Sequence, residues 1–246
     1  MRLDQLLVQR GLLPSREKAR RAVMAGLVSV DGRRVDKAGT AVAADVELAL
    51  RESEPYVSRA GRKLAAALDA FGVDPGGQVC CDVGASTGGF TDCLLERGAA
   101  RVYAVDVGYG QLDARLRNDP RVVVMERTNA RHLQPGDLPE PCDLITVDVS
   151  FISLVKVVPA LLVHLAADGR LLPLVKPQFE SGRRHVGKGG IVRDEAVRRR
   201  VIAERIADLE ALSLECLGVV DSPVKGAGGN REAFALFRRR GAEVTR

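Results

Sequence analysis

From residue 78 onward, short apolar runs alternate along the chain with longer stretches that have helical spacing. Buried strands are indicated at residues 78–82, 101–106, 122–128, 143–148 and 169–176, and helices at residues 91–97, 155–165 and 195–212. Strands that alternate with helices are typical of a parallel sheet covered by helices. The pattern therefore predicts an α/β domain.

The last two strand candidates have a different relationship. Residues 214–220 and 232–238 are separated by a short, glycine-rich connection at residues 226–230. So short a connection favours an antiparallel pair, because parallel strands need a long crossover. An antiparallel last strand starts at the edge where its parallel neighbours end, and Glu232 is its first residue. We therefore expect Glu232 at that edge of the sheet.

The beginning of the chain predicts a separate small module. Apolar residues at helical spacing indicate a first helix near residues 3–7, and Ser15 is a suitable N-cap for a second helix at residues 16–25. A strand pair follows, split by Asp31-Gly32. Residues 51–58 are polar and include Ser53, so they are typical of a linker. We expect two domains, at residues 1–60 and 61–246.

Polar residues stand where the predicted parallel strands end. These are Asp82, Asp106, Asp148 and Lys176. Ligands of open α/β sheets bind outside the carboxyl ends of the strands, so these residues and Glu232 are candidates for one site. Each of them alone is as readily explained as a solvated strand end, but their convergence favours an active site. Lys63 lies before the first strand, on a helix whose position the periodicity does not define.

The loop after the first strand has the pattern Asp82-x-Gly84-x-x-x-Gly88-Gly89 and leads into a helix. Glycine allows backbone to approach a ligand closely, and a helix start presents free amides to it. The pattern is not the dinucleotide fingerprint G-x-G-x-x-G, and the loop carries an acid and no base. A second acid, Asp106, is placed to hold a ribose. These features favour S-adenosylmethionine, with another nucleotide or a simple turn as alternatives.

Basic residues gather on the second predicted helix and just after it. They are Arg16, Lys18, Arg20, Arg21, Arg33, Arg34 and Lys37, and the whole chain has a net charge of +5. Such a face suits phosphates, although a solvated helix surface is the alternative. Stacking on bases would depend on Tyr56, Tyr103, Tyr109 or the phenylalanines, because the chain has no tryptophan. The arginine runs at residues 198–200 and 238–240 are expected to be solvated.

Long motifs in both modules match one known family. They are DVGASTGGFT at residues 82–91, VDVSFIS at 147–153, LVKPQFE at 174–180 and GNREAF at 229–234, with Arg2-Leu-Asp-Gln-Leu-Leu and Leu13-Pro-Ser-Arg near the start. From about residue 2 to residue 238 the chain resembles the TlyA family, historically labelled haemolysin A. The resemblance implies a small α+β S4-type RNA-binding domain followed by an FtsJ-like domain. The latter would have the Rossmann-like class I fold of S-adenosylmethionine-dependent methyltransferases, with an antiparallel last strand.

The resemblance also implies roles for individual residues. The catalytic residues would be Lys63, Asp148, Lys176 and Glu232, with Lys176 as base, Lys63 and Glu232 orienting a ribose 2′-hydroxyl, and Asp148 steadying the lysine. Cofactor contacts are implied at Asp82, Gly84, Ser86, Gly88 and Asp106, while Asn129, by position, either reaches the adenine or is a turn residue. RNA contacts are expected at Arg2, Ser15, Arg16, Lys18, Arg20 and Arg21.

By the same resemblance, the substrate would be a cytidine 2′-hydroxyl of ribosomal RNA in a cytoplasmic ribosomal subunit. The chain begins and ends like the shorter form of the family, so the large subunit and its 23S RNA are expected, with 16S RNA as a further target. A non-catalytic RNA-binding assembly factor is the alternative. A pore-forming haemolysin is disfavoured, because residues 154–167, the longest apolar stretch, are interrupted by Lys156, Pro159 and His164.

The remaining chemistry-bearing residues form no recognisable site. The five cysteines have no C-x-x-C spacing and are expected to be reduced, and the three histidines are scattered, so no metal is expected. Residues 181–194 combine four glycines with Arg183, Arg184, His185 and Lys188. This loop is either part of the RNA-binding face or a flexible surface connection.

Overall fold

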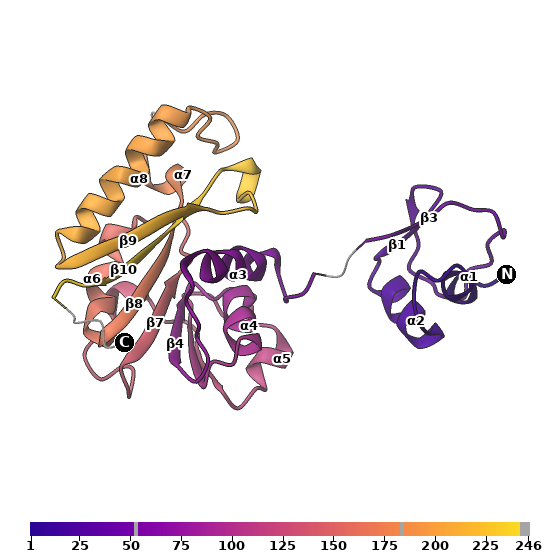
Figure 1. The fold of residues 1–246 in the computed structure, drawn as a ribbon, viewed down its shortest axis with the longest axis horizontal. Coiled ribbons are helices and arrows are strands. Elements are labelled where there is room, and N and C mark those ends of the chain that lie inside the picture. The colour runs from indigo at the N-terminus through magenta and orange to yellow at the C-terminus, as the bar shows by residue number, and fades with distance from the viewer. Residues whose placement is uncertain (52–53, 183–184, 242–246) are drawn as a thin grey trace. The chain divides into compact units, whose positions relative to one another are not determined.

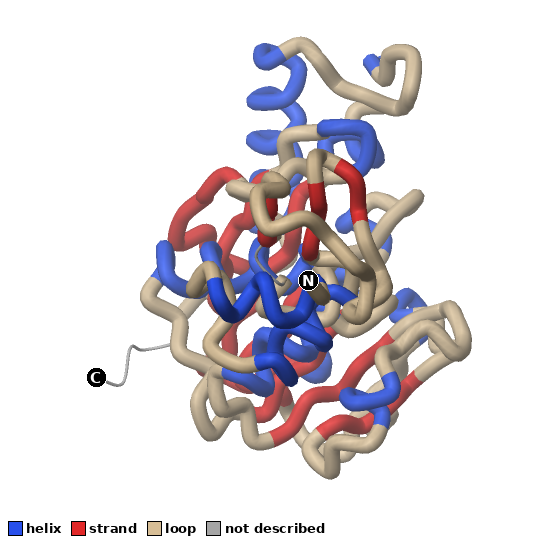
Figure 2. Tube along the Cα trace, turned by 90° about the vertical axis from the view of Figure 1, so that its right-hand side faces the viewer, coloured by secondary structure: helices blue, strands red, loops and turns tan. Residues whose placement is uncertain are grey.

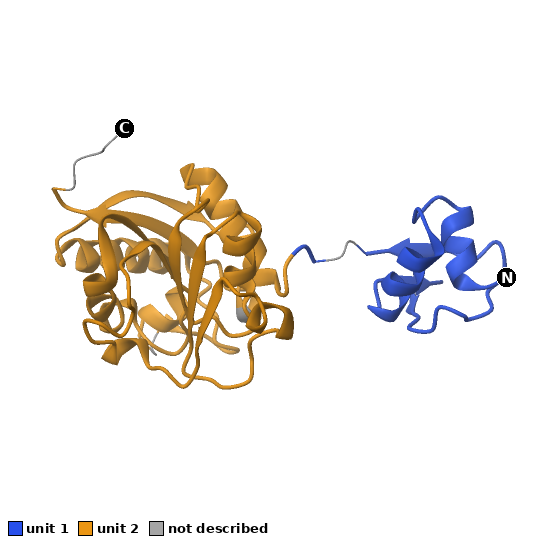
Figure 3. Ribbon diagram, turned by 90° about the horizontal axis from the view of Figure 1, so that it is seen from below, with its two compact units in different colours: residues 1–55 blue, residues 56–246 orange. Residues whose placement is uncertain are grey.

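The computed structural model describes residues 1–51, 54–182 and 185–241. The chain divides into two compact units, Met1–Pro55 and Tyr56–Arg246, which have different colours in Figure 3. Three residues discussed above lie outside the described residues: Ser53 of the expected linker, and Arg183 and Arg184 of the glycine-rich loop.

The first unit packs two helices against a small antiparallel sheet. The elements are α1 (Leu3–Gln9), α2 (Arg16–Met24), β1 (Val28–Val30), β2 (Arg33–Arg34) and β3 (Leu48–Leu50), with strand order β2-β1-β3. Its core contains Leu3, Leu7 and Val23, all fully buried. The Ser15 hydroxyl accepts a hydrogen bond from Lys18 N at 3.2 Å, which confirms the expected N-cap.

The second unit contains a seven-stranded sheet of order β6-β5-β4-β7-β8-β10-β9. Its strands are β4 (Val79–Val83), β5 (Arg101–Val105), β6 (Val122–Met125), β7 (Cys142–Val147), β8 (Leu165–Val175), β9 (Leu214–Asp221) and β10 (Ala233–Arg239). Only β10 runs antiparallel to its neighbours β8 and β9, whereas the other pairings are parallel. The expected mostly parallel sheet with an antiparallel last strand is confirmed.

Helices cover both faces of this sheet. They are α3 (Arg59–Phe71), α4 (Gly89–Glu96), α5 (Ala114–Arg117), α6 (Val158–Leu161), α7 (Pro177–Glu180) and α8 (Glu195–Glu210), with 3-10 turns at Ala130–His132, Leu154–Lys156, Leu162–His164 and Ala227–Gly229. Successive strand residues face opposite ways, so Leu144 packs with α3 and α4 while Ile145 packs with α6 and α8. Figure 1 shows these helix pairs on the two sides of the sheet, and Figure 2 marks strands in red and helices in blue.

Three expectations need correction. The helix expected at residues 155–165 is a series of short turns, because Pro159 lacks the amide hydrogen that a continuous helix requires and instead stands in the first turn of α6. Strand β8 begins at Leu165 rather than near residue 169, since Leu165 already pairs with Cys142. Arg198, expected to be solvated, is only 5% exposed.

Candidate active site

The edge of the sheet predicted from the sequence collects charged side chains from five strands. Asp106, Asp148 and Lys176 directly follow β5, β7 and β8, Asp82 is the penultimate residue of β4, and Glu232 directly precedes β10. Because β10 runs opposite to its neighbours, its first end meets the last ends of the parallel strands. Topology therefore brings residues from distant parts of the sequence to one edge.

Four of the site candidates form two ion pairs. Lys63 Nζ lies 2.6 Å from Glu232 Oε2, and Lys176 Nζ lies 2.6 Å from Asp148 Oδ1. The four side chains are between 2% and 15% exposed. Removing charges from water is costly even when they are paired, so these pairs are poor sources of stability and candidates for a chemical role.

Each ion pair also has a hydrogen bond to a neighbouring polar side chain. Lys176 Nζ also donates to Ser150 Oγ at 3.0 Å, and Gln178 Nε2 donates to Glu232 Oε1 at 3.0 Å. Ala233 pairs with Val175 across the β8–β10 ladder. One step further along this register, Glu232 and Lys176 are cross-strand neighbours, so the two pairs belong to one cluster.

Helix α3 supplies Lys63, the member that periodicity could not place. The helix ends at Gly72, which has φ of 62° and makes a left-handed C-cap. Leu64 and Leu68 are fully buried in the core shared with α4, and this packing orients the helix. Lys63 immediately precedes Leu64, and its largely buried side chain brings the amine to Glu232.

The loop between β4 and α4 requires glycine for local reasons. Gly84 has φ of 88°, and a Cβ there would lie 2.5 Å from the backbone oxygen of Asp148. Gly88 has φ of 95°, and a Cβ would lie 2.2 Å from Leu116 Cδ1. The loop thus passes close against the strand end that carries Asp148, and its glycines allow this approach.

Next to this loop is a cleft of 480 Å³ whose lining includes Gly84, Ser86, Asp106, Asn129, Asp148 and Phe151. Further polar residues, Gln111, Thr128, Arg131 and Ser150, and several apolar residues complete the lining. Asp106 accepts hydrogen bonds from Ser86 N at 2.8 Å and from Gly108 N at 2.7 Å, one on each carboxylate oxygen. Each oxygen retains a lone pair for a ribose hydroxyl. Asn129 lines the same cleft, and its Oδ1 accepts a hydrogen bond from Arg131 N at 3.2 Å.

Asp82 and Gly88 are not part of the cleft wall. Asp82 is fully buried, and its Oδ2 accepts hydrogen bonds from Thr91 N at 2.9 Å and Thr91 Oγ1 at 2.7 Å. Burial raises the pKa of Asp82 to about 7, opposed by the Thr91 hydrogen bonds and reinforced by the charges of Asp148 and Asp106. Through these hydrogen bonds, Asp82 joins the end of β4 to the first turn of α4.

One aromatic side chain at the site was not singled out from the sequence. Phe151 is 90% exposed and has φ of 63°, a conformation that is strained for a bulky residue. Its ring centroid lies 4.8 Å from that of Phe179, and Phe179 in turn lies 5.9 Å from Lys176 Nζ. The sequence signal was an apolar aromatic residue directly after the polar strand end Asp148–Ser150.

In the first unit, several RNA-binding candidates also have structural partners. Arg2 donates to both carboxylate oxygens of the buried Asp4, each at 3.0 Å, and this hydrogen bonding lowers the pKa of Asp4. Arg16 lies 3.5 Å from the same carboxylate, and Arg21 pairs with Glu17. Lys18 and Arg20 are exposed on α2. All candidates except Arg2 thus lie on α2 or at its N-cap, whereas Arg2 is the N-cap of α1, and Arg2 and Ser15 already have roles in the fold.

The residues present fit S-adenosylmethionine. Two carboxylates, Asp106 and Asp148, line the cleft, and their negative charge favours a sulfonium cation. A Cβ at Gly84 would narrow the space beside the strand ends. With the parallel sheet and its antiparallel last strand, these features define a class I methyltransferase, whose methyl donor is S-adenosylmethionine.

Comparison with known proteins agrees with this class. Residues 56–239 match the FtsJ-like methyltransferase family, and residues 1–48 match the S4 domain. The 16S/23S rRNA (cytidine-2′-O)-methyltransferase TlyA of Mycobacterium tuberculosis is 48% identical over 239 residues, which cover 96% of this chain and 89% of that protein. Hemolysin A of Brachyspira hyodysenteriae is 40% identical over 238 residues, covering 96% of this chain and 99% of that protein.

A solved structure of a protein described as a hemolysin from Streptococcus thermophilus superimposes with a TM-score of 0.77 at 42% identity. The match covers 98% of this chain and 89% of that one. The chain belongs to the TlyA family, in which an S4 domain precedes an FtsJ-like methyltransferase domain. Within the described residues no helix is long and apolar enough to cross a membrane, and no three potential ligand side chains are grouped to hold a metal ion.

Proposed function

We propose that this protein transfers a methyl group from S-adenosylmethionine to the 2′-hydroxyl of a cytidine in ribosomal RNA, with 23S RNA of the large subunit as first target and 16S RNA as the alternative. The observation that carries the proposal is the pair of buried ion pairs, Lys63–Glu232 and Lys176–Asp148, beside the cofactor cleft. The names of the relatives support RNA and cytidine. The reaction would take place in the cytoplasm, where ribosomal subunits are found.

S-adenosylmethionine bound in the cleft would supply an electrophilic methyl group, with a neutral thioether as the leaving group. The 2′-oxygen forms the new bond to the methyl carbon as the sulfur–carbon bond breaks, and the hydroxyl proton must leave in the same step. Lys176 Nζ accepts this proton in the proposed mechanism. The ion pair with Asp148 and the hydrogen bond to Ser150 Oγ hold this amine in place at the strand ends.

Lys176 can accept a proton only in its neutral amine form, because an ammonium group has no lone pair. Lys63 and Glu232 orient the hydroxyl from the other side, with Lys63 donating to the 2′-oxygen and Glu232 holding Lys63. Gln178 keeps the other oxygen of Glu232 occupied. Such fixed geometry contributes to the rate because the reacting atoms need no further alignment.

The target nucleotide needs a support for its base, and we assign this role to Phe151. Single-stranded bases are commonly held by stacking on exposed aromatic rings. Phe151 presents such a ring in the lining of the cleft that Asp148 shares, and it is supported by Phe179. Its left-handed backbone conformation is a cost that a surface loop without function would not be expected to keep.

The backbone of the RNA would run past a second opening in the same unit. This pocket of 200 Å³ is lined by Ser58, Arg59, Ala60, Lys63, Val224, Lys225 and Gly226. Arg59 and Lys225 are exposed, and both are cations. A phosphate beside the target ribose would therefore meet positive charge next to Lys63.

The first unit, residues 1–60 with the linker at about 51–58, would hold the RNA, and the second unit would perform the chemistry. Lys18 and Arg20 are exposed on α2, and Arg2, Ser15, Arg16 and Arg21 stand on or beside that helix. Contacts to phosphate position an RNA without reading its bases. In this proposal the S4 domain supplies affinity for the RNA. The shape of the RNA and the stacking of the target base on Phe151 determine which nucleotide is methylated.

The test is transfer of radiolabelled methyl from S-adenosylmethionine to large and small ribosomal subunits that lack the modification. Wild type should label one or both RNAs, and Lys176→Ala should reduce the rate about 10²- to 10⁴-fold while still binding cofactor. Lys156→Met changes an exposed lysine of the same unit and serves as the control. Labelled RNA is then digested to locate the 2′-O-methylated cytidine.

Each outcome distinguishes a class of function. Label on RNA that Lys176→Ala abolishes supports the proposal and identifies the subunit. Binding of S-adenosylmethionine and RNA without any transfer would favour the non-catalytic assembly factor. Label that persists in Lys176→Ala would contradict the assigned base while leaving the methyltransferase intact.

A further inference from the structure

Helix α8 carries a buried arginine that the chemistry above does not use. Arg198 is 5% exposed, and its guanidinium donates to three acceptors. Nε donates to the backbone oxygen of Arg231 at 3.1 Å, Nη1 to Glu195 Oε1 at 3.0 Å, and Nη2 to Asp221 Oδ1. Arginine is rarely buried unless it is paired, and these three acceptors provide the partners that a buried Arg198 requires.

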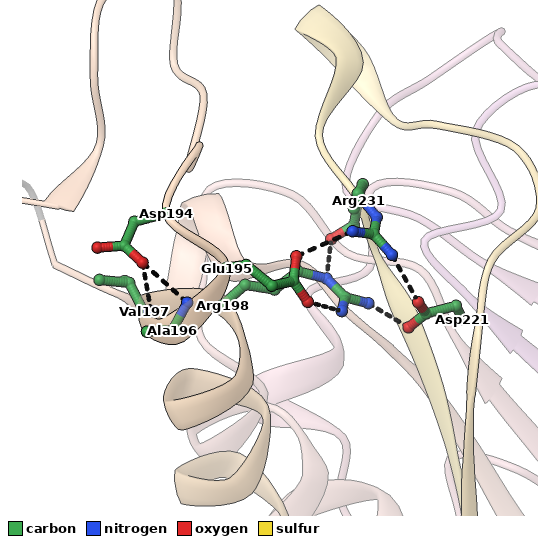
Figure 4. A network of polar contacts seen from close by, with 7 residues as sticks. All are labelled: Asp194, Glu195, Ala196, Val197, Arg198, Asp221 and Arg231. Atoms are coloured by element: carbon green, nitrogen blue, oxygen red, sulfur yellow. Dashed lines mark hydrogen bonds and ion pairs between the residues drawn. The ribbon is translucent and has the colours of Figure 1, made fainter.

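The same two carboxylates also bind a second arginine. Arg231 Nη1 lies 2.9 Å from Glu195 Oε2, and Arg231 Nη2 lies 3.1 Å from Asp221 Oδ2. Each carboxylate therefore bridges Arg198 and Arg231, as Figure 4 shows. Two positive and two negative charges form a closed ring that joins α8 to β9 and to the segment before β10.

This ring holds the peptide that carries Glu232. The backbone oxygen that Arg198 binds belongs to the peptide unit joining Arg231 to Glu232. On the other side, the backbone oxygen of Glu232 accepts from Ser222 N at 2.9 Å. Arg231 is 55% exposed on its side chain and Glu232 is 2% exposed, so the two side chains leave this segment in different directions.

The residue before Arg231 is held as well. Asn230 is 3% exposed, accepts from Val192 N at 3.0 Å and donates to Gly190 O at 2.9 Å. The space around the Glu232 carboxylate is narrow, since a Cβ at Gly226 would lie 2.0 Å from its Oε1. A small displacement of the segment would therefore change the distance between Glu232 and Lys63.

We propose that Arg198 is a positioning residue for methyl transfer, which holds the Arg231–Glu232 peptide and thereby keeps the Glu232 carboxylate against Lys63. Arg198 does not touch the reacting atoms. This inference rests on the proposed function, since it assumes that Glu232 acts in that reaction. Displacing a catalytic group by about 1 Å can cost about 10²-fold in rate, so a residue remote from the chemistry can control it.

Lysine is a poor substitute at this position. The guanidinium offers five donors in a planar fork, and here three of its nitrogens serve three acceptors at once. An ammonium on a flexible stem keeps the charge but cannot match this fork. Comparing Arg198→Lys with Arg198→Met therefore separates the effect of the positive charge from the effect of the arrangement of donors.

The test uses the full-length protein and the subunit labelled by wild type. Arg198→Met should lower kcat about tenfold to a hundredfold, while KM for RNA and the dissociation constant of S-adenosylmethionine change less than about twofold. Arg198→Lys should recover only part of the loss. Arg199→Met, an exposed arginine next to it on α8, is the matched control and should behave as wild type.

A double-mutant cycle separates positioning from general destabilisation. If Arg198 acts through Glu232, Arg198→Met should cause no further loss of kcat in a Glu232→Gln background. Multiplied losses, or an unchanged kcat in Arg198→Met, would overturn the proposal. Should Arg198→Met fail to fold, Asp221→Asn removes one bridging charge and should lower kcat in the same non-additive way.

The methyl-transfer activity of wild type distinguishes failure of the proposed function from failure of the proposed role of Arg198. Wild type that transfers no methyl to any RNA would overturn the proposed function, and the positioning role with it. Active wild type with additive variants would overturn only the role of Arg198.

Discussion

Lys63 and Glu232 are 169 residues apart in the sequence, and their Nζ and Oε2 atoms lie 2.6 Å apart. One stands on a helix before the first strand of the sheet, and the other directly precedes its antiparallel strand β10. Both side chains are largely buried, so each depends on the other for compensation of its charge.

Single and double substitutions of Lys63 and Glu232 should affect stability and catalysis differently. Lys63→Met or Glu232→Met leaves one buried charge without its partner, so each should destabilise the catalytic unit by about 3 kcal/mol. The double variant removes both charges and should be more stable than either single variant. All three should transfer methyl much more slowly than wild type, as measured beside urea unfolding. A double variant that regains activity would contradict a catalytic role for the pair.

Phe151 should affect the RNA substrate. Stacking on an aromatic ring contributes about 1–3 kcal/mol per base, so Phe151→Ala should lower kcat/KM for RNA by about tenfold to a hundredfold. Phe151→Tyr retains a ring and should keep most of the activity. Steady-state kinetics on the labelled subunit measures both. Loss of equal size in the two variants would point to the backbone conformation of residue 151 rather than to stacking.

Asp82 should make stability depend on pH. Its pKa is raised to about 7 in the folded protein, above about 3.9 for an unfolded aspartate. A raised pKa means that this contribution to stability is fully present below about pH 4 and is lost as pH rises through about 7. Relative to Asp82→Asn, wild type should therefore lose stability between these values, by an amount on the order of a few kcal/mol.

The measurement is urea unfolding of both proteins at several pH values. Only the change in their difference with pH is diagnostic, because the asparagine amide adds buried donors at every pH. A difference that stays constant from pH 4 to pH 8 would contradict the raised pKa.

The basic face of α2 should govern the salt dependence of RNA binding. If Lys18 and Arg20 contact phosphates, Lys18→Ala and Arg20→Ala should each reduce the slope of log affinity against log salt by about 0.7 to 1. Transfer at saturating RNA should remain near wild type. Met24→Ala, an exposed residue on the same helix, is the control. Binding is measured by filter retention or fluorescence over a range of salt concentrations, and unchanged slopes would place the RNA elsewhere.

Much of the fold follows from local patterns. Apolar runs that end in polar residues predicted the parallel strands, a short glycine-rich connection predicted the antiparallel pair, and Ser15 predicted a helix start. These signals work because hydrogen-bonding geometry and burial act within a few residues. The prediction of one helix at residues 155–165 was wrong because Pro159 lacks the amide hydrogen that a continuous helix needs, and it stands in the first turn of the short helix α6.

The sequence by itself determined that Asp82, Asp106, Asp148, Lys176 and Glu232 share one edge, since strand direction alone sends them there. Tertiary structure decided their partners: Lys63 meets Glu232, Lys176 meets Asp148, and Asp82 turns away from the cleft. It also decided that Arg198 is buried and that the exposed Phe151 packs on Phe179. Strand order and helix packing set distances between side chains far apart in the chain, and no local periodicity contains those distances.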